Sequence, residues 1–471
     1  KCWELRRETC CTVIIIRTYC SPQLKPVEVT NSLVMLLIWG YDGTKSVFQS
    51  RSEKMKKSLL ALSVAVGISL TGCGGKDPQE LIQSAQQNLQ QGDEAAAVVE
   101  LKTVLQEDPR NTQARFMLGK LYSDNGGAVA ATKELFAALE GGYDINAVTT
   151  ELAPMLYLQS DTSGFNQLLD IRNELNATAE SLLIAYDGLT SLELGELERA
   201  ADSLREASAI EENQYTQLLR GYIQFSNGDV EGAMSIAKNL VAENENFAES
   251  HFLLGQLALM QNNAGLAVSE FDTYHELMPE NFRGTVFLAN ALVKNKDYNR
   301  AEPLIDQLLS VSAEQPFLNF LKSVVSFQNK DYKAANLHSV KAIQNGYTQD
   351  TARVIAGLSA FLLDKTEQAY DQLVPLKDKF SSDNPVMKLL SHLSLQLGYL
   401  DTVDGIMAKD SELSDDEIIV LSKVTADLVS RGELERGRKL SSRLKSAQPN
   451  SEWAMISKGF AQLTIGDLQG I

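Results

Sequence analysis

Gly195-Glu-Leu-Glu-Arg-Ala200 is one copy of a short turn that returns as Lys296-Asp-Tyr-Asn-Arg-Ala301 and Lys330-Asp-Tyr-Lys-Ala-Ala335. Twelve such turns start at Gly92, Gly126, Ser160, Gly195, Gly228, Asn262, Lys296, Lys330, Asp364, Gly398, Gly432 and Gly466. They are 34 residues apart, except that the intervals on either side of Gly195 are 35 and 33 residues. A fixed period of this length is typical of a solenoid, in which one supersecondary unit is repeated and stacked.

Small residues flank each turn and predict close packing of two helices. Glycine or another small residue stands seven positions before most turns, and alanine recurs five positions after the turn starts. The glycines are Gly119, Gly188, Gly221, Gly255, Gly357 and Gly459, and the alanines are Ala97, Ala131, Ala200, Ala233, Ala267, Ala301, Ala335 and Ala369. A bulky side chain there would hold the helices apart. Since the apolar spacing is also helical, each unit is expected to be a helix, a tight turn and a second helix.

The pattern resembles the tetratricopeptide repeat, which has a small residue at position 8, alanine at position 20 and proline at position 32. The resemblance implies an all-α, right-handed α-solenoid rather than a non-repeating helical bundle. By this register, eleven repeats fill residues 78–451 and start at Pro78, Thr112, Asn146, Ser181, Gln214, Ala248, Phe282, Pro316, Asp350, Asn384 and Ile418. Residues 452–471 form a twelfth repeat that is cut short, so we expect the chain to be a piece of a longer protein.

Residues 55–72 have the pattern of a secretory signal. A basic start at Met55-Lys-Lys57 is followed by an apolar run from Leu59 to Leu70 and by small residues. The apolar run is too short for a permanent membrane-spanning helix, which needs about 20 residues.

The signal ends in Leu70-Thr-Gly-Cys73, which resembles the bacterial lipoprotein box. The resemblance implies cleavage before Cys73, acylation of that residue by groups such as palmitate, and a lipidated N-terminus and tether over residues 73–77. Because Gly74 stands where an inner-membrane retention signal has aspartate, it also implies the periplasmic face of the outer membrane in a diderm host. A cysteine that ends the signal by chance is the alternative.

Residues 1–54 have a different composition from the rest of the chain. They begin on Lys1 rather than methionine and hold four of the five cysteines and two of the three tryptophans. We interpret them as translated upstream sequence without structure, with Met55 as the true start. A genuine extension before an internal signal is the alternative.

The charge and the motifs argue against several classes of function. The chain carries a net charge of −18, and residues 73–471 carry −23. Nucleic acids and anionic lipid surfaces both require clustered Lys and Arg, so neither is expected as a partner. Cysteine is absent after Cys73, and the four histidines (His251, His275, His338 and His392) form no zinc motif. With no nucleophile elbow or phosphate loop either, we predict no enzyme activity, no metal and no cofactor.

In the repeats that the chain resembles, positions 2, 5, 9, 12 and 13 of the unit face a concave groove. Transferred to repeats five to eight, these positions give the candidate groove residues Tyr215, Leu218, Tyr222, Phe225, Phe252, Met260, Asn290, Lys294, Phe317, Phe320 and Phe327. Such a strip could hold an extended peptide or an amphipathic helix, or stack on sugar rings. The alternative is that the aromatic side chains are ordinary core.

A second resemblance concerns the front of the mature chain. It rests on Cys73-Gly-Gly-Lys-Asp-Pro78, Leu118-Gly-Lys-Leu-Tyr122 and Gly142-Tyr-Asp144, together with the lipoprotein box. This region is similar to the tetratricopeptide-repeat lipoproteins of the PEP-CTERM/exosortase system, the PrsT family. The resemblance implies a non-enzymatic protein that acts with exopolysaccharide biosynthesis and export or with exosortase protein sorting.

Three interpretations of function follow. The first is a lipid-anchored periplasmic scaffold for protein–protein interactions in exopolysaccharide export or PEP-CTERM sorting, with cell-envelope proteins and possibly polysaccharide as partners. The second is a general adaptor for envelope assembly or secretion. The third is the tetratricopeptide region of an enzyme, such as a glycosyltransferase, whose catalytic domain lies beyond Ile471.

Overall fold

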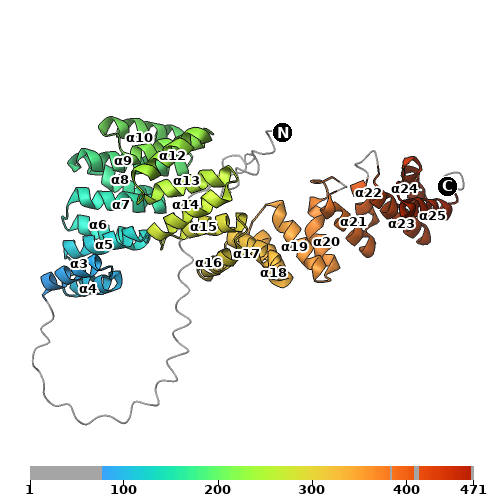
Figure 1. Cartoon of the computed structure of the whole chain (residues 1–471), viewed down its shortest axis with the longest axis horizontal. Coiled ribbons are helices and arrows are strands. Elements are labelled where there is room, and N and C mark those ends of the chain that lie inside the picture. The colour runs from blue at the N-terminus through green and yellow to red at the C-terminus, as the bar shows by residue number, and fades with distance from the viewer. Residues whose placement is uncertain (1–76, 382–383, 408–412, 468–471) are drawn as a thin grey trace, which may run out of the picture. The chain divides into compact units, whose positions relative to one another are not determined.

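The structure, a computed structural model, describes residues 77–381, 384–407 and 413–467 (Figure 1). These residues form 23 α-helices and two 3₁₀ turns, and no strand occurs among them. The all-α fold class is therefore confirmed. The segment 1–54, the signal over 55–72 and Cys73 lie outside the described residues.

The described chain divides into two compact units. The first holds residues 77–123 and 128–219, and the second holds residues 124–127 and 220–467, so that the division passes through α11 (Gln214–Ser226). The earlier helices are α3 (Pro78–Gln90), α4 (Glu94–Glu107), α5 (Thr112–Asp124), α6 (Ala128–Glu140), α7 (Ile145–Gln159), α8 (Thr162–Asp170), α9 (Ala177–Glu193) and α10 (Leu197–Ile210). A 3₁₀ turn, η1 (Arg172–Glu174), connects α8 to α9.

The second unit continues the same alternation of helices. It contains α12 (Val230–Glu243), α13 (Ala248–Met260), α14 (Ala264–Leu277), α15 (Phe282–Lys294), α16 (Tyr298–Val311), α17 (Pro316–Gln328), α18 (Tyr332–Gln344), α19 (Asp350–Leu362), α20 (Thr366–Leu373), η2 (Val374–Leu376), α21 (Pro385–Leu397), α22 (Leu400–Met407), α23 (Asp415–Ser430), α24 (Leu434–Ser446) and α25 (Glu452–Thr464). The odd-numbered α-helices are the first helices of the pairs, and α5, α11, α13, α15, α17, α19 and α25 begin at the expected repeat starts.

The turn inside each pair has one backbone mechanism. All twelve turn starts expected from the period have a positive φ, between 50° and 85°. A left-handed residue ends an α-helix and redirects the chain, and glycine adopts this conformation without a Cβ clash. The next residue often caps the second helix: Asp93 accepts a hydrogen bond from the Ala96 N–H, and Asp331 accepts one from the Ala334 N–H. Turn and cap together explain why the short motif recurs.

Two of the repeats end with a tyrosine at the position where other repeats have a proline. Tyr143 stacks on Phe116 with ring centroids 4.4 Å apart, and Tyr347 stacks on Phe320 at 4.5 Å. In both cases the phenylalanine occupies position 5 and the tyrosine position 32 of the unit. Gly142 and Gly346, with φ of 85° and 99°, end the preceding helices and bring the tyrosines back to the first helix.

The small positions lie where the two helices of a pair touch. A Cβ added to Gly255 would lie 2.8 Å from the Phe271 ring, and one added to Gly119 would lie 2.7 Å from Leu135 Cγ. Gly188, Gly221 and Gly357 are equally crowded by neighbouring side chains, and the eight expected packing alanines are fully buried. Gly459 differs, because nothing described lies within 4 Å of an added Cβ.

A polar contact joins the two helices of three pairs at the same register, with the partners 19 positions apart in the sequence. Arg115 forms an ion pair with Glu134, His251 Nδ1 lies 2.7 Å from Glu270 Oε2, and His338 Nδ1 lies 2.9 Å from Asn319 Oδ1. His251 and His338 therefore have structural roles inside their pairs.

Candidate functional site: the inward face of the first helices

The candidate groove residues differ in how much of each side chain is accessible. Leu218, Phe225, Phe252 and Asn290 are buried, Lys294 is exposed, and Tyr215, Tyr222, Met260, Phe317, Phe320 and Phe327 are half-buried. Tyr215 and Leu218 belong to the first unit, and the others belong to the second. The buried residues pack the scaffold, so only the half-buried and exposed ones can contact a ligand directly.

Phe252 shows why some inward positions are closed. Its ring lies 4.9 Å from the rings of Tyr274 and Phe287, and the Arg283 guanidinium covers it at 5.0 Å. These neighbours come from two helices, α14 and α15, and the Phe252 side chain is only 5% exposed. A ligand could reach this ring only if the cluster opened.

Around α17, by contrast, an aromatic surface stays partly open. Phe317 and Phe320 have ring centroids 6.3 Å apart, and the Tyr347 ring stacks on Phe320 at an interplanar angle of 20°. All three side chains are half-buried. Aromatic faces of this kind provide rigid contact area for apolar side chains of a partner.

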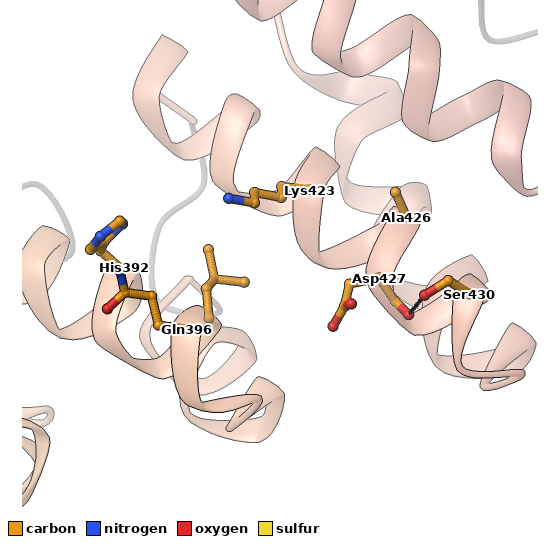
Figure 2. Close-up of a pocket in the computed structure, with 7 residues that line it drawn as sticks. His392, Gln396, Lys423, Ala426, Asp427 and Ser430 are labelled. Carbon is orange, nitrogen blue, oxygen red and sulfur yellow. Dashed lines mark hydrogen bonds between the residues drawn. The ribbon is translucent and has the colours of Figure 1, made fainter. Parts of the chain in front are cut away.

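A hollow of about 370 Å³ lies between α21 and α23 in the second unit. It is lined by His392, Leu395 and Gln396 from α21 and by Lys423, Ala426, Asp427 and Ser430 from α23. Figure 2 shows the Lys423 amine on the side of the hollow that faces His392 and Gln396, with Asp427 and Ser430 farther along α23. The walls thus combine hydrogen-bonding groups with an apolar floor.

The charges in the hollow are unequally neutralised. The Asp427 carboxylate lies 2.9 Å from Arg431 Nη2, and Ser430 Oγ donates a hydrogen bond to the Asp427 carbonyl at 2.8 Å. Lys423 is exposed and pairs with no carboxylate among the residues that the structure describes. The hollow therefore presents an available cation to whatever enters it.

The sequence interpretation missed this hollow although the signal was present. His392 and Gln396 occupy positions 9 and 13 of the tenth repeat, and Ala426 and Ser430 occupy the same positions of the eleventh. The candidate groove residues stop at repeat eight because the interpretation relied on aromatic side chains. The side chains that line the hollow are mostly polar. The structure places His392, one of the four histidines that form no zinc motif, at the wall of the hollow.

A shallower depression of about 470 Å³ lies between α14 and α16. Its floor includes Leu288 and Leu304, and Arg300 bridges its rim to Asp272 at 2.5 Å. The ion pairing of the rim leaves it fewer free groups than the hollow between α21 and α23.

The described ranges contain neither a metal-binding cluster nor a membrane-spanning helix. Between residues 77 and 467, leaving out the undescribed gaps, no three His, Cys, Asp or Glu residues are placed to hold a metal ion. None of the described helices is both long and apolar enough to cross a membrane.

Comparison with known proteins identifies the repeat. Residues 88–146 match the family model described as tetratricopeptide repeat. No curated protein matches the chain. Among solved structures, PilF of Pseudomonas aeruginosa is 16% identical with a TM-score of 0.39, and covers 48% of this chain and 99% of its own.

Two further solved structures are similar. A tetratricopeptide repeat protein from Parabacteroides merdae is 18% identical with a TM-score of 0.28, and covers 60% of this chain and 98% of its own. Yeast Tom70 is 12% identical with a TM-score of 0.30, and covers 79% of this chain and 93% of its own. The family match places a tetratricopeptide repeat at residues 88–146, and the described helices after it continue in the same paired, all-α arrangement.

Proposed function

We propose that this protein is a scaffold that holds protein partners on the inward face of its first helices. The observation that carries the proposal is the hollow between α21 and α23, whose polar groups and available Lys423 amine are presented for binding. The half-buried aromatic side chains of α17 add a second contact surface. Tetratricopeptide-repeat proteins bind protein partners, and solenoids use such extended surfaces for that purpose.

The scaffold acts at the cell envelope, where a lipid on Cys73 holds it to the periplasmic face of the outer membrane. Support comes from the basic and apolar segment over residues 55–72 and from the box that ends at Cys73. Metabolic labelling of producing cells with an alkyne-bearing palmitate analogue tests the anchor. The parent should carry the label and sediment with the outer membrane, and Cys73→Ser should lose both properties. Equal labelling of the two proteins would refute the anchor.

The partners that we propose are proteins of exopolysaccharide export or of PEP-CTERM sorting, following the resemblance at the front of the mature chain. A general role in envelope assembly or secretion is the second candidate. Photo-crosslinking in cells, with benzoylphenylalanine replacing Phe320 or His392, tests both. The control places the same probe at Leu337, which is 63% exposed on the second helix α18.

The crosslinked products discriminate between the candidates. An export or sorting protein trapped from Phe320 and His392, but not from Leu337, supports the first candidate. Outer-membrane assembly or secretion proteins in its place support the second, and captured glycan would indicate direct handling of polymer. Identical products at all three positions would contradict a binding surface on the inward face.

A further inference from the structure

The depression between α14 and α16 lies outside the inward face of the repeats. Its walls come from the second helices of repeats six and seven, and its floor includes Leu288, at position 7 of repeat seven. None of its lining residues occupies position 2, 5, 9, 12 or 13 of a unit. Complete described repeats precede and follow these two, so the depression is not produced by the end of the array.

A proline inside α16 departs from the repeat pattern at this depression. Position 22 is proline in repeat seven and in none of the other ten complete repeats. Because Pro303 has no N–H, the helix bond that would join it to the Asn299 carbonyl cannot form. Both residues line the depression, so a backbone acceptor is left at its edge. Departures from the local rules of a fold are expected at functional positions.

The histidine in the wall also provides an acceptor. Thr285 Oγ1 donates its one hydrogen to the Asn281 carbonyl at 3.1 Å. It therefore accepts the hydrogen of His275 Nδ1, which lies 3.3 Å away. In the neutral imidazole, Nε2 then carries the lone pair, and it has no partner among the residues that the structure describes.

The charge around the depression is negative. Glu276 is exposed and pairs with no cation in the described part of the chain. Arg300 is offset by two carboxylates, Asp272 Oδ1 at 2.5 Å and Asp297 Oδ2 at 3.8 Å. An anionic ligand would have to compete with these carboxylates for Arg300. A cationic ligand would neutralise Glu276 without breaking an existing ion pair.

We propose that this depression binds an arginine side chain of a protein partner. The methylene stem lies on Leu288 and Leu304, and the guanidinium donates hydrogen bonds to Glu276, His275 Nε2 and the Asn299 carbonyl. Three separate acceptors above an apolar floor match arginine, because it joins five N–H donors to an apolar stem. This inference goes beyond the proposed function, because it adds a contact surface on the second helices.

The size of the depression is sufficient for this ligand. Its volume of about 470 Å³ falls within the range of about 300–1,000 Å³ that is usual for ligand pockets. A partner segment could therefore insert the arginine together with part of a neighbouring side chain.

Two synthetic peptides test the proposal with the full chain. Both are fluorescein-labelled heptapeptides with leucines on either side of a central residue. That residue is arginine in one peptide and its neutral analogue citrulline in the other. Fluorescence anisotropy in about 150 mM salt limits binding to distant exposed charges. The arginine peptide should have a dissociation constant at least about tenfold lower. Equal binding of both peptides, or binding of neither, would overturn the proposal.

Matched carboxylate substitutions locate the site. Glu276→Gln removes the unpaired charge and should bring the dissociation constants of the two peptides within about twofold of each other. Its control is Glu140→Gln, at an exposed carboxylate that occupies the same position 29 in repeat two. This variant should keep the preference of the parent. An arginine preference that survives Glu276→Gln would show that the peptide binds elsewhere on the acidic surface, and the proposal would fail.

The proline allows a test in which binding and stability change independently. Pro303→Ala restores the N–H, so the Asn299 carbonyl gains a partner within the helix and becomes a weaker acceptor for the ligand. The variant should bind the arginine peptide about threefold more weakly, although its thermal stability is equal or higher. Pro154→Ala, at the other proline inside a described helix, should leave binding unchanged. Unchanged or tighter binding by Pro303→Ala would contradict the proposed site.

The photo-crosslinking described above separates this inference from the proposed function. A partner captured from Phe320 and His392, combined with no preference for the arginine peptide, would leave the scaffold role intact and refute the inference. An arginine preference that Glu276→Gln abolishes, combined with no capture from Phe320 or His392, would support the inference and refute the inward binding face.

Discussion

The front and the rear of the repeat array share one architecture but differ in surface chemistry. Residues 77–219 contain 24 Asp and Glu against 8 Lys and Arg, whereas residues 220–471 contain 32 against 24. The exposed large apolar residues of the first region are the aliphatic Val99, Val129, Leu194 and Leu197, while every exposed Phe, Tyr and Trp described lies in the second.

What the two regions share shows which positions the scaffold controls. Both have the left-handed turn with its cap, the position 5 to position 32 ring stack and the polar contact between paired helices. The repeat therefore fixes the positions that join helices and leaves the others free to vary. Lys and Arg residues and exposed aromatic groups are more numerous in the second region, which is where we place partner binding.

The largest effect is expected from overpacking the position 8 glycines. Gly255→Leu in the second region should cost about 3 kcal/mol, because the new side chain meets the rigid Phe271 ring. Gly119→Leu in the first region should cost less, because the flexible Leu135 can change rotamer. Gly459→Leu, with open space around the glycine, is the control. Urea unfolding measures all three, and equal midpoints for Gly255→Leu and Gly459→Leu would contradict the packing assignment.

The stability that the polar contacts between paired helices contribute should depend on pH in the second region but not in the first. Burial lowers the pKa of His251, but hydrogen bonds to the Glu270 carboxylate and the Glu245 carbonyl outweigh it and raise the pKa. The stabilisation, about 2 kcal/mol for hydrogen bonds to a charged group, is complete below the ordinary histidine pKa and is lost as pH rises through the raised value. The corresponding contact in the first region is the ion pair between Arg115 and Glu134, which contains no histidine.

Hydrogen exchange measured from pH 5 to 9 tests this difference. After correction for intrinsic rates, protection of α13 and α14 should fall with rising pH, and protection of α5 and α6 should not. His251→Gln should abolish the pH dependence in α13 and α14. A parallel fall in all four helices would show that the histidine is not the cause.

Removing either ring stack should lower the stability by a smaller amount, and the two losses should be equal. Tyr143→Leu and Tyr347→Leu keep an apolar side chain but remove the stacking, which contributes about 1 kcal/mol. Because the geometries are nearly identical, 4.4 Å and 16° against 4.5 Å and 20°, the two losses should agree within about 0.5 kcal/mol. A loss in one region only would show that the surroundings of the repeat, rather than its register, decide the contribution.

The smallest effect concerns the turns. Lys296 and Lys330 of the second region hold φ of 62° and 63°, a conformation that favours glycine. Lys330→Gly should raise stability by about 0.5 kcal/mol, the relief of strain being partly offset by the entropy of glycine. Gly92→Lys in the first region is the reverse substitution and should lower the stability. Thermal unfolding measures the change in stability of both variants. Stability changes of the same sign would contradict the assigned conformations.

The sequence predicted the fold class because its information is local and repeated. A left-handed turn recurs twelve times, a capping side chain and small residues at fixed positions accompany many of the copies, and each copy supports the others. The inward face was less predictable. Phe252 and His392 both occupy inward positions of the register, and only Phe252 is among the candidate groove residues, yet Phe252 is buried and His392 lines a hollow.

By itself, the sequence determined the repeat, the turns and the positions at which paired helices touch, because each depends on residues within one period. The tertiary structure decided which inward side chains remain open. Phe252 and Phe320 both occupy position 5, but three aromatic rings and an arginine surround the first, while among the described residues two rings, those of Phe317 and Tyr347, lie beside the second. Burial depends on the side chains that neighbouring units contribute, and one repeat's own pattern does not specify them.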